Sequence, residues 1–473
     1  MKKFLTVLGI WLLVFILSAM PCYAWEDLSN GTHVEITAQS AILIDLDTES
    51  VLYRKSINET CYPASLTKMM TLLVAYEHTV SRRDENITIT REMIDVPNGS
   101  SSAELVEGDV ISIRDLYYAM MLPSGNDAAR CLAMVTSGSE EAFVELMNAK
   151  AQELGMTGTQ YRNAHGFDEK GHYTTTYDLA LLACELCRNP ELIEIFSLYR
   201  YTASLRSVSK PDEVRETTFY NTNTMLNPNA AVYLEGLKGI KTGYTAQAGN
   251  CLASYYEKDG RRMVAVVTRS DVNHRDSDTK ELISYGLKQF DTFYVGELFS
   301  SRKIVVDVNN AEESDESNGQ LELYLEPLEA DHAVTVSKTE GTKIRTFRDG
   351  TLSIRTPVVN APVRTGDDVG EVEFVYNQQV LYRARALASR SVDAAAESPQ
   401  NLVSMGIRGK IRISFGFLAS KSFWIPVGIV LALIALTLAF LAMRRRQARK
   451  VRSRQKAGVN RRRRRASAGR RRI

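Results

Sequence analysis

Two uncharged apolar segments, one near each end of the chain, set the strongest limit on how this sequence can fold. The first, residues 4–17, follows Lys2 and Lys3 and precedes the small residue Ala24, a pattern typical of a secretory signal cleaved after residue 24. The second, residues 423–443, has 21 residues without a charge, which is long enough to span a hydrocarbon core of about 30 Å. The folded domains therefore have to form between these two segments.

The charge distribution predicts the orientation of the chain across a membrane. Residues 444–473 contain 16 Lys and Arg and no Asp or Glu, so the positive-inside rule predicts a cytoplasmic tail and places everything before the span outside. We expect this tail to lie on anionic lipid, with nucleic-acid contact as the alternative. Residues 25–443 hold 40 Lys and Arg against 56 Asp and Glu, a net charge of about −16, so we expect no nucleic-acid binding by the folded part.

Five cysteines remain after removal of the signal, an odd number spread over apolar segments. This distribution argues against a disulfide framework. Cys184 and Cys187 form a C-x-x-C pair, but no second Cys or His pair follows at the spacing of a zinc site. We therefore expect buried free thiols and no metal site at Cys61, Cys131, Cys184, Cys187 and Cys251.

The hydrophobic pattern of residues 25–298 predicts a mixed α/β domain. A hairpin is expected over residues 40–55, strands between residues 237 and 268, and a last helix at about 279–293. Strands, then helices, then strands predict a mainly antiparallel sheet packed with helices. The other expected helices lie at about 64–78, 111–122, 127–135, 140–154 and 179–187, the last preceded by a capping box that contains Asp178.

The remaining extracytoplasmic residues predict a second, smaller domain. After an acidic stretch at 311–318, short alternating segments within residues 299–390 predict a small all-β domain, interpreted as a sandwich. Residues 391–422 are interpreted as a linker, part of which could lie on the membrane face.

The first of three short motifs with chemical meaning is Ser65-x-x-Lys68. Pro63 suits the first turn of a helix, and the nearly all-apolar residues that follow predict a buried helix on which Ser65 and Lys68 share a face. Burial favours the neutral form of a lysine, so Lys68 can take the proton from Ser65, whose hydroxyl is otherwise a poor nucleophile. By itself, the motif equally fits an N-capping serine and a snorkelling lysine.

The second motif, Ser124-Gly-Asn126, falls in a turn between two predicted helices. There Ser124 could relay a proton to a leaving amine, and the Asn126 amide could hold a substrate carbonyl. Short motifs also occur by chance, and the first two patterns are matched again at Ser207/Lys210, Ser300/Lys303 and Ser56/Asn58.

The third motif, Lys241-Thr242-Gly243, ends a predicted strand. Its cation and hydroxyl suit a terminal carboxylate, and Gly243 leaves room for a peptide backbone alongside. An oxyanion hole needs two N–H groups aimed at one point, and the backbone groups of Ser65 and Tyr244 are the candidates.

In this order the three motifs resemble those of the serine-type D-alanyl-D-alanine carboxypeptidases, the low-molecular-mass penicillin-binding proteins. The segments 163–168 and 241–249 also resemble that family, and the similarity covers about residues 30–390, the β-rich second domain included. The resemblance implies a β-lactamase/DD-peptidase-like fold. It also implies roles for individual residues: Ser65 as acylated nucleophile, Lys68 as its base, Ser124 in proton transfer, Lys241 and Thr242 at the substrate carboxylate, and His165 as a structural residue in its loop.

Arg275, just before the last predicted helix, could face the same carboxylate, and a solvated arginine is the alternative. The function implied by the resemblance is removal of the terminal D-Ala from peptidoglycan stem peptides outside the cell membrane, through an acyl-enzyme at Ser65 and without metal or cofactor. β-Lactams are expected to acylate the same serine. Many members of the family end in an amphipathic helix, whereas this chain ends in a predicted span and a basic tail.

The sequence also bears on three other functions. A class A β-lactamase needs a glutamate that activates the deacylating water, but no Glu-x-x-Leu-Asn lies between Asn126 and Lys241, and Glu145-Leu-Met-Asn148 has the wrong spacing. A non-catalytic scaffold or sensor would be signalled by a lost motif residue, and none is lost, but a β-lactam sensor can keep them all and deacylate slowly. The sequence does not separate a carboxypeptidase from an endopeptidase that cuts cross-links.

Overall fold

The computed structural model describes residues 26–29, 31, 33–300, 302–328, 332–346, 352–376 and 378–395. The predicted signal, span and basic tail lie outside these residues. Within them, no helix is both long enough and apolar enough to cross a membrane.

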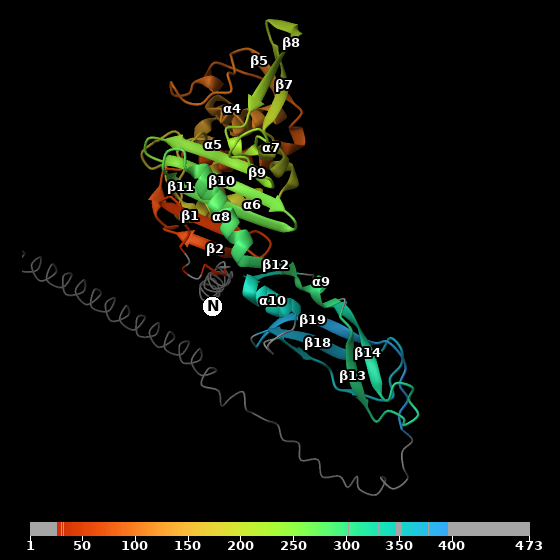
Figure 1. Ribbon diagram of the computed structural model, residues 1–473. Coiled ribbons are helices and arrows are strands. Elements are labelled where there is room, and N and C mark those ends of the chain that lie inside the picture. Colours follow the sequence, from red (N-terminus) through yellow and green to blue (C-terminus); the bar gives the residue numbers. More distant parts are fainter. Residues whose placement is uncertain are drawn as a thin grey trace, which may run out of the picture. The chain divides into compact units, whose positions relative to one another are not determined.

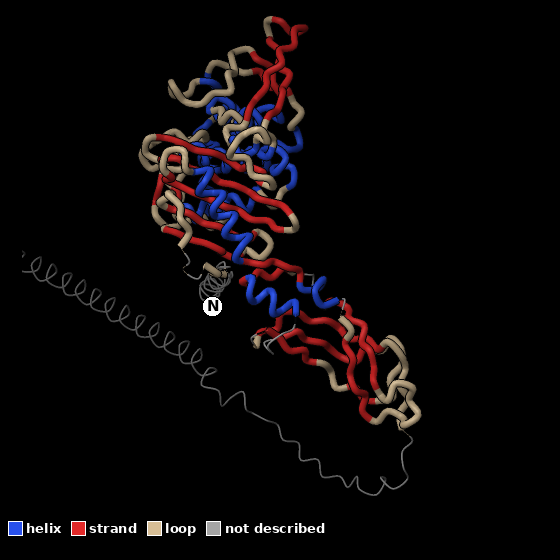
Figure 2. The backbone as a smooth tube through the Cα atoms, in the orientation of Figure 1, coloured by secondary structure: helices blue, strands red, loops and turns tan. Residues whose placement is uncertain are grey.

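The centre of the first domain is a five-stranded antiparallel sheet, as the pattern predicts. Alternate residues of its strands are buried on opposite faces: Ile42 and Ile44 pack into one core and Leu43 into another. The helix α8 (Arg275–Gln289) covers one face and the other helices cover the second, so the domain has three layers (Figures 1 and 2). The sheet order is β2-β1-β11-β10-β9, with β1 Ser40–Asp45, β2 Ser50–Lys55, β9 Leu237–Thr245, β10 Gly249–Lys258 and β11 Arg261–Ser270.

The helical layer contains the buried helix that follows Pro63 in the sequence. The helix α2 (Thr67–Thr79) has ten buried residues among its thirteen. Almost every side chain on it is apolar or forms a hydrogen bond inside the core. The predicted helices are confirmed within a few residues at each end. Their bounds are α2 Thr67–Thr79, α3 Ile113–Met121, α4 Asn126–Ser137, α5 Glu140–Glu153 and α6 Thr176–Leu186. A helix that was not predicted, α7 Pro190–Ser197, follows, and the short 3-10 turns are η1 Ala64–Leu66, η2 Val80–Arg82, η3 Glu92–Ile94 and η4 Thr224–Leu226.

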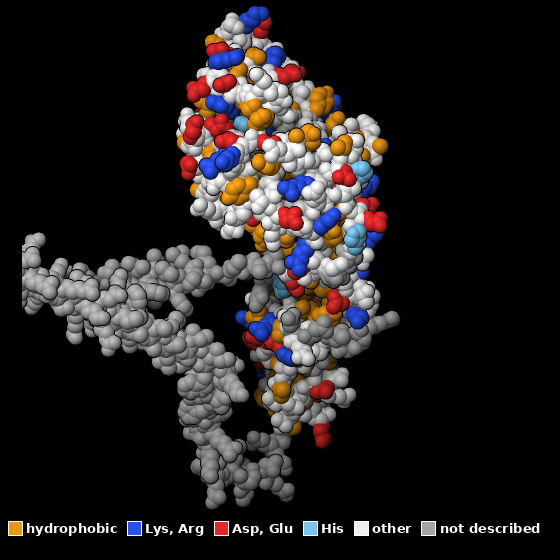
Figure 3. Space-filling view, turned by 90° about the vertical axis from the view of Figure 1, so that its left-hand side faces the viewer, with side chains coloured by type: hydrophobic (Ala, Val, Ile, Leu, Met, Phe, Trp, Pro, Cys, Tyr) orange, Lys and Arg blue, Asp and Glu red, His pale blue; other side chains and the backbone are white. Residues whose placement is uncertain are grey.

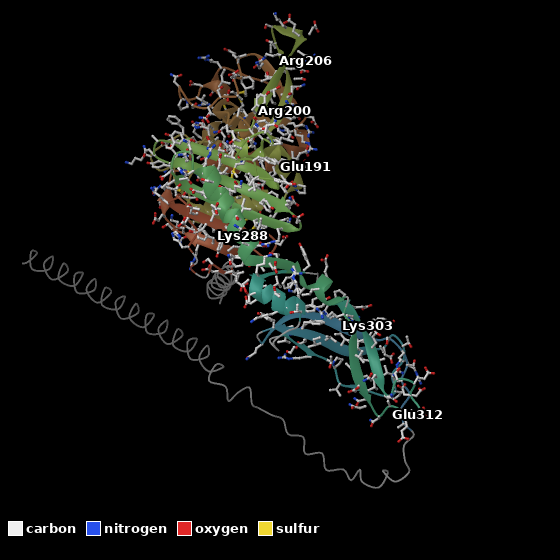
Figure 4. The ribbon with its side chains drawn as sticks, viewed as in Figure 1. Glu191, Arg200, Arg206, Lys288, Lys303 and Glu312 are labelled. Atoms are coloured by element: carbon white, nitrogen blue, oxygen red, sulfur yellow. The ribbon has the colours of Figure 1, made fainter. Side chains whose placement is uncertain are left out.

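A second sheet, of order β4-β5-β7-β8, was not predicted. Its long hairpin, β7 (Arg200–Ser207) and β8 (Lys210–Tyr220), is mostly exposed, so its sequence has little of the apolar alternation that marks a half-buried strand. Ser207 and Lys210 lie at its turn, next to Arg206 near the tip in Figure 4. The remaining short strands are β3 Thr60–Cys61, β4 Asn86–Thr88, β5 Asp109–Ser112 and β6 Thr174–Thr175.

The end of the last predicted helix is wrong. The helix α8 stops at Gln289, and β12 (Phe290–Tyr294) pairs with β15 (Ala333–Ser337), about forty residues further on. Phe290 and Phe293 are buried in this arrangement, and a strand partner so far along the chain leaves no local signal.

The β-rich part of the chain is not purely β. Its main sheet has the order β16-β18-β19-β14-β13-β17, and two helices accompany it, α9 (Val295–Ser300) and α10 (Lys338–Thr346), which the all-β expectation missed. Exposed charges on α10 hide its helical period, since only Gly341 and Ile344 are buried. The strands are β13 Ile304–Asn309, β14 Gln320–Pro327, β16 Leu352–Arg355, β17 Val359–Asn360, β18 Asp368–Tyr376 and β19 Gln379–Ala388.

Opposite charges are interspersed on the face shown in Figure 3. On that face, Lys and Arg side chains alternate with Asp and Glu rather than forming one broad basic surface.

Candidate active site

The turn that carries Ser65 is held in an unusual backbone conformation. Ala64 has a positive φ of 47°, which is rare for a residue with a side chain, and the tight turn η1 follows before α2 begins at Thr67. Ser65 is partly exposed, whereas Lys68, one turn later, is completely buried. The predicted helix therefore places an accessible hydroxyl above a buried amine.

Three oxygen atoms surround the Lys68 amine. Its Nζ atom lies 3.1 Å from Ser65 Oγ, 2.6 Å from Asn126 Oδ1 and 2.7 Å from the backbone carbonyl oxygen of His165. Burial, together with the nearby charge of Lys241, lowers the pKa of Lys68 well below its usual value, and Asp127 acts in the opposite direction. The first two motifs thus meet at one amine, a contact of Asn126 that the sequence did not predict.

The His165 carbonyl is held in place by a tightly packed loop. Asn163 Oδ1 accepts a hydrogen bond from the Gly166 N–H at 2.7 Å, and Thr71 on α2 donates to the Ala164 carbonyl at 2.5 Å. Gly166 has a φ of +91°, and a β-carbon there would lie 1.9 Å from the Ala64 carbonyl oxygen. Only glycine fits between this loop and the turn that carries Ser65.

The imidazole of His165 does not bind Lys68. Burial, with the charge of Lys68, lowers the His165 pKa to about 3, so the ring is neutral at physiological pH. His165 binds Lys68 through its backbone carbonyl oxygen. Sequence reasoning that looks for titratable side chains does not identify such a contact.

Ser124 and Gly125 form a strained turn before α4. Ser124 has a φ of +66°, and its buried Oγ atom has no hydrogen-bond partner among the residues described here. A β-carbon at Gly125 would lie 2.7 Å from the Ala119 carbonyl oxygen and 2.8 Å from Asp127 Oδ1. Strain and an unpaired polar atom at one residue point to a functional position.

Asp127, at the start of α4, is the site residue that sequence reasoning missed. Its buried carboxylate accepts hydrogen bonds from Ser102 Oγ at 2.7 Å and from the N–H groups of Ala103 at 2.8 Å, Leu105 at 3.2 Å and Ala128 at 2.9 Å. The sequence gives little indication of this role, because Asp residues are common in the first turn of a helix. Here the Asp127 carboxylate binds the segment 102–105 next to the start of α4, where Asn126 lies.

The third motif lies on β9, against the nucleophile turn. A β-carbon at Gly243 would lie 3.3 Å from the Ser65 backbone nitrogen and 3.3 Å from Ala64 Cβ, so this glycine lets β9 pack against the turn. The sequence predicts room for a substrate backbone at Gly243, whereas the structure places the nucleophile turn there. Tyr244, the next residue, is 64% exposed.

Lys241 is a buried cation without an acidic partner among the described residues. Its Nζ atom donates one long hydrogen bond, 3.3 Å, to the Thr242 carbonyl, while Thr242 Oγ1 lies 2.6 Å from Thr222 Oγ1. Burial, together with the charge of Arg275, lowers the Lys241 pKa to about 7. The charge of Arg275 thus acts on Lys241, and the Arg275 Nε atom binds Asp276 at 3.1 Å.

Asp178 and the five cysteines, also considered in the sequence analysis, contribute to the fold and not to the candidate site. Thr175 caps α6 by accepting from the Asp178 N–H, and the five cysteines are buried with free thiols. In the described ranges, no group of three or more His, Cys, Asp or Glu side chains is arranged to hold a metal ion.

Comparison with known proteins identifies the family. A family profile described as D-alanyl-D-alanine carboxypeptidase, of peptidase family S11, matches residues 27–271. D-alanyl-D-alanine carboxypeptidase DacF of Bacillus subtilis is 32% identical over 298 residues, which are 62% of this chain and 72% of that protein. DacA of Escherichia coli is also 32% identical, over 59% of this chain and 70% of its own length.

Solved structures agree with this result. Penicillin binding protein 6B from Escherichia coli superposes with a TM-score of 0.56 at 26% identity, covering 77% of this chain and 99% of its own. The Streptomyces K15 DD-transpeptidase superposes with a TM-score of 0.51 at 28% identity, covering 54% and 99%. By its fold, its motifs and these relatives, the chain belongs to the D-alanyl-D-alanine carboxypeptidase family of serine hydrolases and penicillin-binding proteins.

Proposed function

We propose that this carboxypeptidase works through an acyl-enzyme on Ser65, with Lys68 as the base. The observation that carries this proposal is the set of contacts around the Lys68 amine. A neutral amine has two hydrogens and one lone pair. The carbonyl oxygens of Asn126 and His165 can only accept, so they take both hydrogens and leave the lone pair for the Ser65 hydroxyl, 3.1 Å away.

The other predicted site residues complete the reaction. Ser65 attacks the carbonyl of the penultimate D-Ala, and its proton passes to Lys68. The Ser124 hydroxyl gives its proton to the nitrogen of the leaving D-Ala and takes up the proton held by Lys68. Water then attacks the acyl group, and one of its protons returns to Ser65 as the acid is released. Lys241, Thr242 and Arg275 bind the terminal carboxylate, Asn126 and Gly243 border the peptide, and the N–H groups of Ser65 and Tyr244 stabilise the oxyanion.

We also infer the domain organisation and location from the sequence. The proposed order is a signal peptide at 1–24, a catalytic domain at 25–298, a β-rich domain at 299–390, a linker at 391–422, a membrane span at 423–443 and a cytoplasmic tail at 444–473. In this arrangement the enzyme acts on peptidoglycan stem peptides outside the membrane, in cell-wall biogenesis. Carbonate extraction of membranes tests the anchor: the full chain should stay with the membrane, and a chain ending at residue 422 should be released.

The mechanism is tested with the full chain in detergent. We expect D-Ala release from diacetyl-Lys-D-Ala-D-Ala, its inhibition by penicillin, and the loss of both release and penicillin labelling in Ser65→Ala. Covalent penicillin on a residue other than Ser65 would overturn the assignment of the nucleophile. Penicillin labelling at Ser65 without D-Ala release would instead indicate a sensor or a cross-link endopeptidase.

A further inference from the structure

The direction of a bound peptide follows from the order of groups along β9, if the proposed function holds. The terminal carboxylate lies at Lys241 and Thr242, and the next residue, Gly243, packs against Ser65, where the scissile carbonyl must lie. The part of the peptide before the scissile bond therefore continues past Tyr244 toward Thr245. At about 3.3 Å per residue, the residue that precedes the D-Ala pair comes close to this end of the strand.

A cavity begins where β9 reaches the loop that supports Lys68. Thr245 Oγ1 donates to Asp168 Oδ1 at 3.0 Å, and Asp168 lines a cavity of about 750 Å³. His165 lines the same cavity, and its carbonyl oxygen is the one bound by Lys68 at 2.7 Å. The cavity thus borders the loop that supports the proposed catalytic amine, at the end of β9 toward which the peptide runs.

The cavity has a mostly polar, net negative lining with a smaller apolar part. Phe167, Val96 and Pro97 contribute apolar surface, and Phe167 is 42% exposed. Five carboxylates and two guanidinium groups complete the charged lining: Asp95, Glu140, Glu141, Asp168 and Glu169, with Arg130 and Arg162.

Not all of these carboxylates are neutralised within the protein. Arg130 pairs with Glu140 at 3.3 Å, and the Ala164 N–H also binds Glu140. Glu141 forms no ion pair among the described residues, and Glu169 accepts only a 3.3 Å hydrogen bond from the Asn163 amide. Among the residues that line the cavity, the carboxylates of Glu141 and Glu169 therefore remain available to a cation.

We infer that this cavity receives the side chain of the residue before the D-Ala pair, and that it selects a side chain ending in a protonated amine. The methylene groups of such a chain would contact Phe167 and Pro97, while the ammonium group would reach Glu141 and Glu169. An aminoalkyl side chain matches both parts of the lining, whereas a neutral amide end would leave these carboxylates without a counter-charge.

The test compares two peptides that differ only at this amine. Full-length enzyme is assayed with Nα-acetyl-Lys-D-Ala-D-Ala, which has a free ε-amine, and with the Nα,Nε-diacetyl form. We expect kcat/KM to favour the free amine by about tenfold at low salt, which corresponds to about 1.4 kcal/mol, and to favour it less at 0.5 M salt. The double variant Glu141→Gln/Glu169→Gln should reduce the preference to less than about threefold.

Glu145→Gln is the matched control, because Glu145 is an exposed carboxylate on the same helix, α5, that does not line the cavity. It should keep the preference of the wild type. Equal rates on the two peptides, or a preference that survives in the double variant, would overturn this inference while D-Ala release itself continues. Failure of the proposed function is distinguishable, because neither peptide would then release D-Ala.

Discussion

Gly166→Ala should inactivate the enzyme without touching any group proposed to act on substrate. The added β-carbon would lie 1.9 Å from the Ala64 carbonyl oxygen, 2.5 Å from its carbon and 2.9 Å from Thr67 Oγ1. An ordinary contact needs the carbon and oxygen to separate by about 1.5 Å more. Either the loop that holds the His165 carbonyl or the turn that carries Ser65 must move by that amount.

Both movements harm the same step. If the loop moves, Lys68 loses the acceptor at 2.7 Å, and if the turn moves, Ser65 leaves its place 3.1 Å from Lys68. A displacement of about 1 Å at a reacting group can cost about a hundredfold in rate, so we expect penicillin acylation to slow at least that much. The clash and the positive φ together should lower the free energy of unfolding by about 3 kcal/mol.

Gly138→Ala separates the clash from the backbone effect. Gly138 has a similar φ of +86° at the end of α4, and no described atom lies within 4 Å of a β-carbon added there. We expect a loss of about 1 kcal/mol in the free energy of unfolding and normal acylation. The reasoning fails if Gly166→Ala acylates within threefold of the wild type and is no less stable than Gly138→Ala, as measured by fluorescent penicillin kinetics and thermal unfolding.

Three further predictions concern pH and binding. In the proposed mechanism Lys68 acts in its deprotonated form and Lys241 in its protonated form. The value of kcat/KM should therefore rise with pH as Lys68 loses its proton, and fall above about pH 7 as Lys241 loses its proton. A pH profile of kcat/KM that stays flat above pH 7 would contradict this. Asp127 raises the Lys68 pKa, so Asp127→Asn should move the acid limb to lower pH, whereas a purely structural role would lower the rate and leave the limb in place. The Arg275 charge lowers the Lys241 pKa, so Arg275→Gln should move the alkaline limb to higher pH and raise KM; an unchanged limb and KM would place Arg275 outside the site.

Local patterns of the sequence predict many of the helices, strands and motifs of this protein. The first hairpin, the buried helix after Pro63 and the three motifs are each contained within a few neighbouring residues, and their order along the chain points to the family. Apolar periodicity reports which face of an element is buried, so it predicted the central sheet and its helices. It did not reveal β7 and β8, whose side chains are mostly exposed, or β12, whose partner is remote in the chain.

Only the tertiary structure decided how the motifs become a site. The acceptors of the Lys68 amine come from Asn126, 58 residues away, and from a backbone oxygen at His165, 97 residues away. A carbonyl group is present in every residue, so composition cannot single out the one at His165. The need for glycine at 166 likewise arises from Ala64, a residue about a hundred positions earlier. Residue types determine what chemistry is available, but close packing between distant segments determines which atoms face each other.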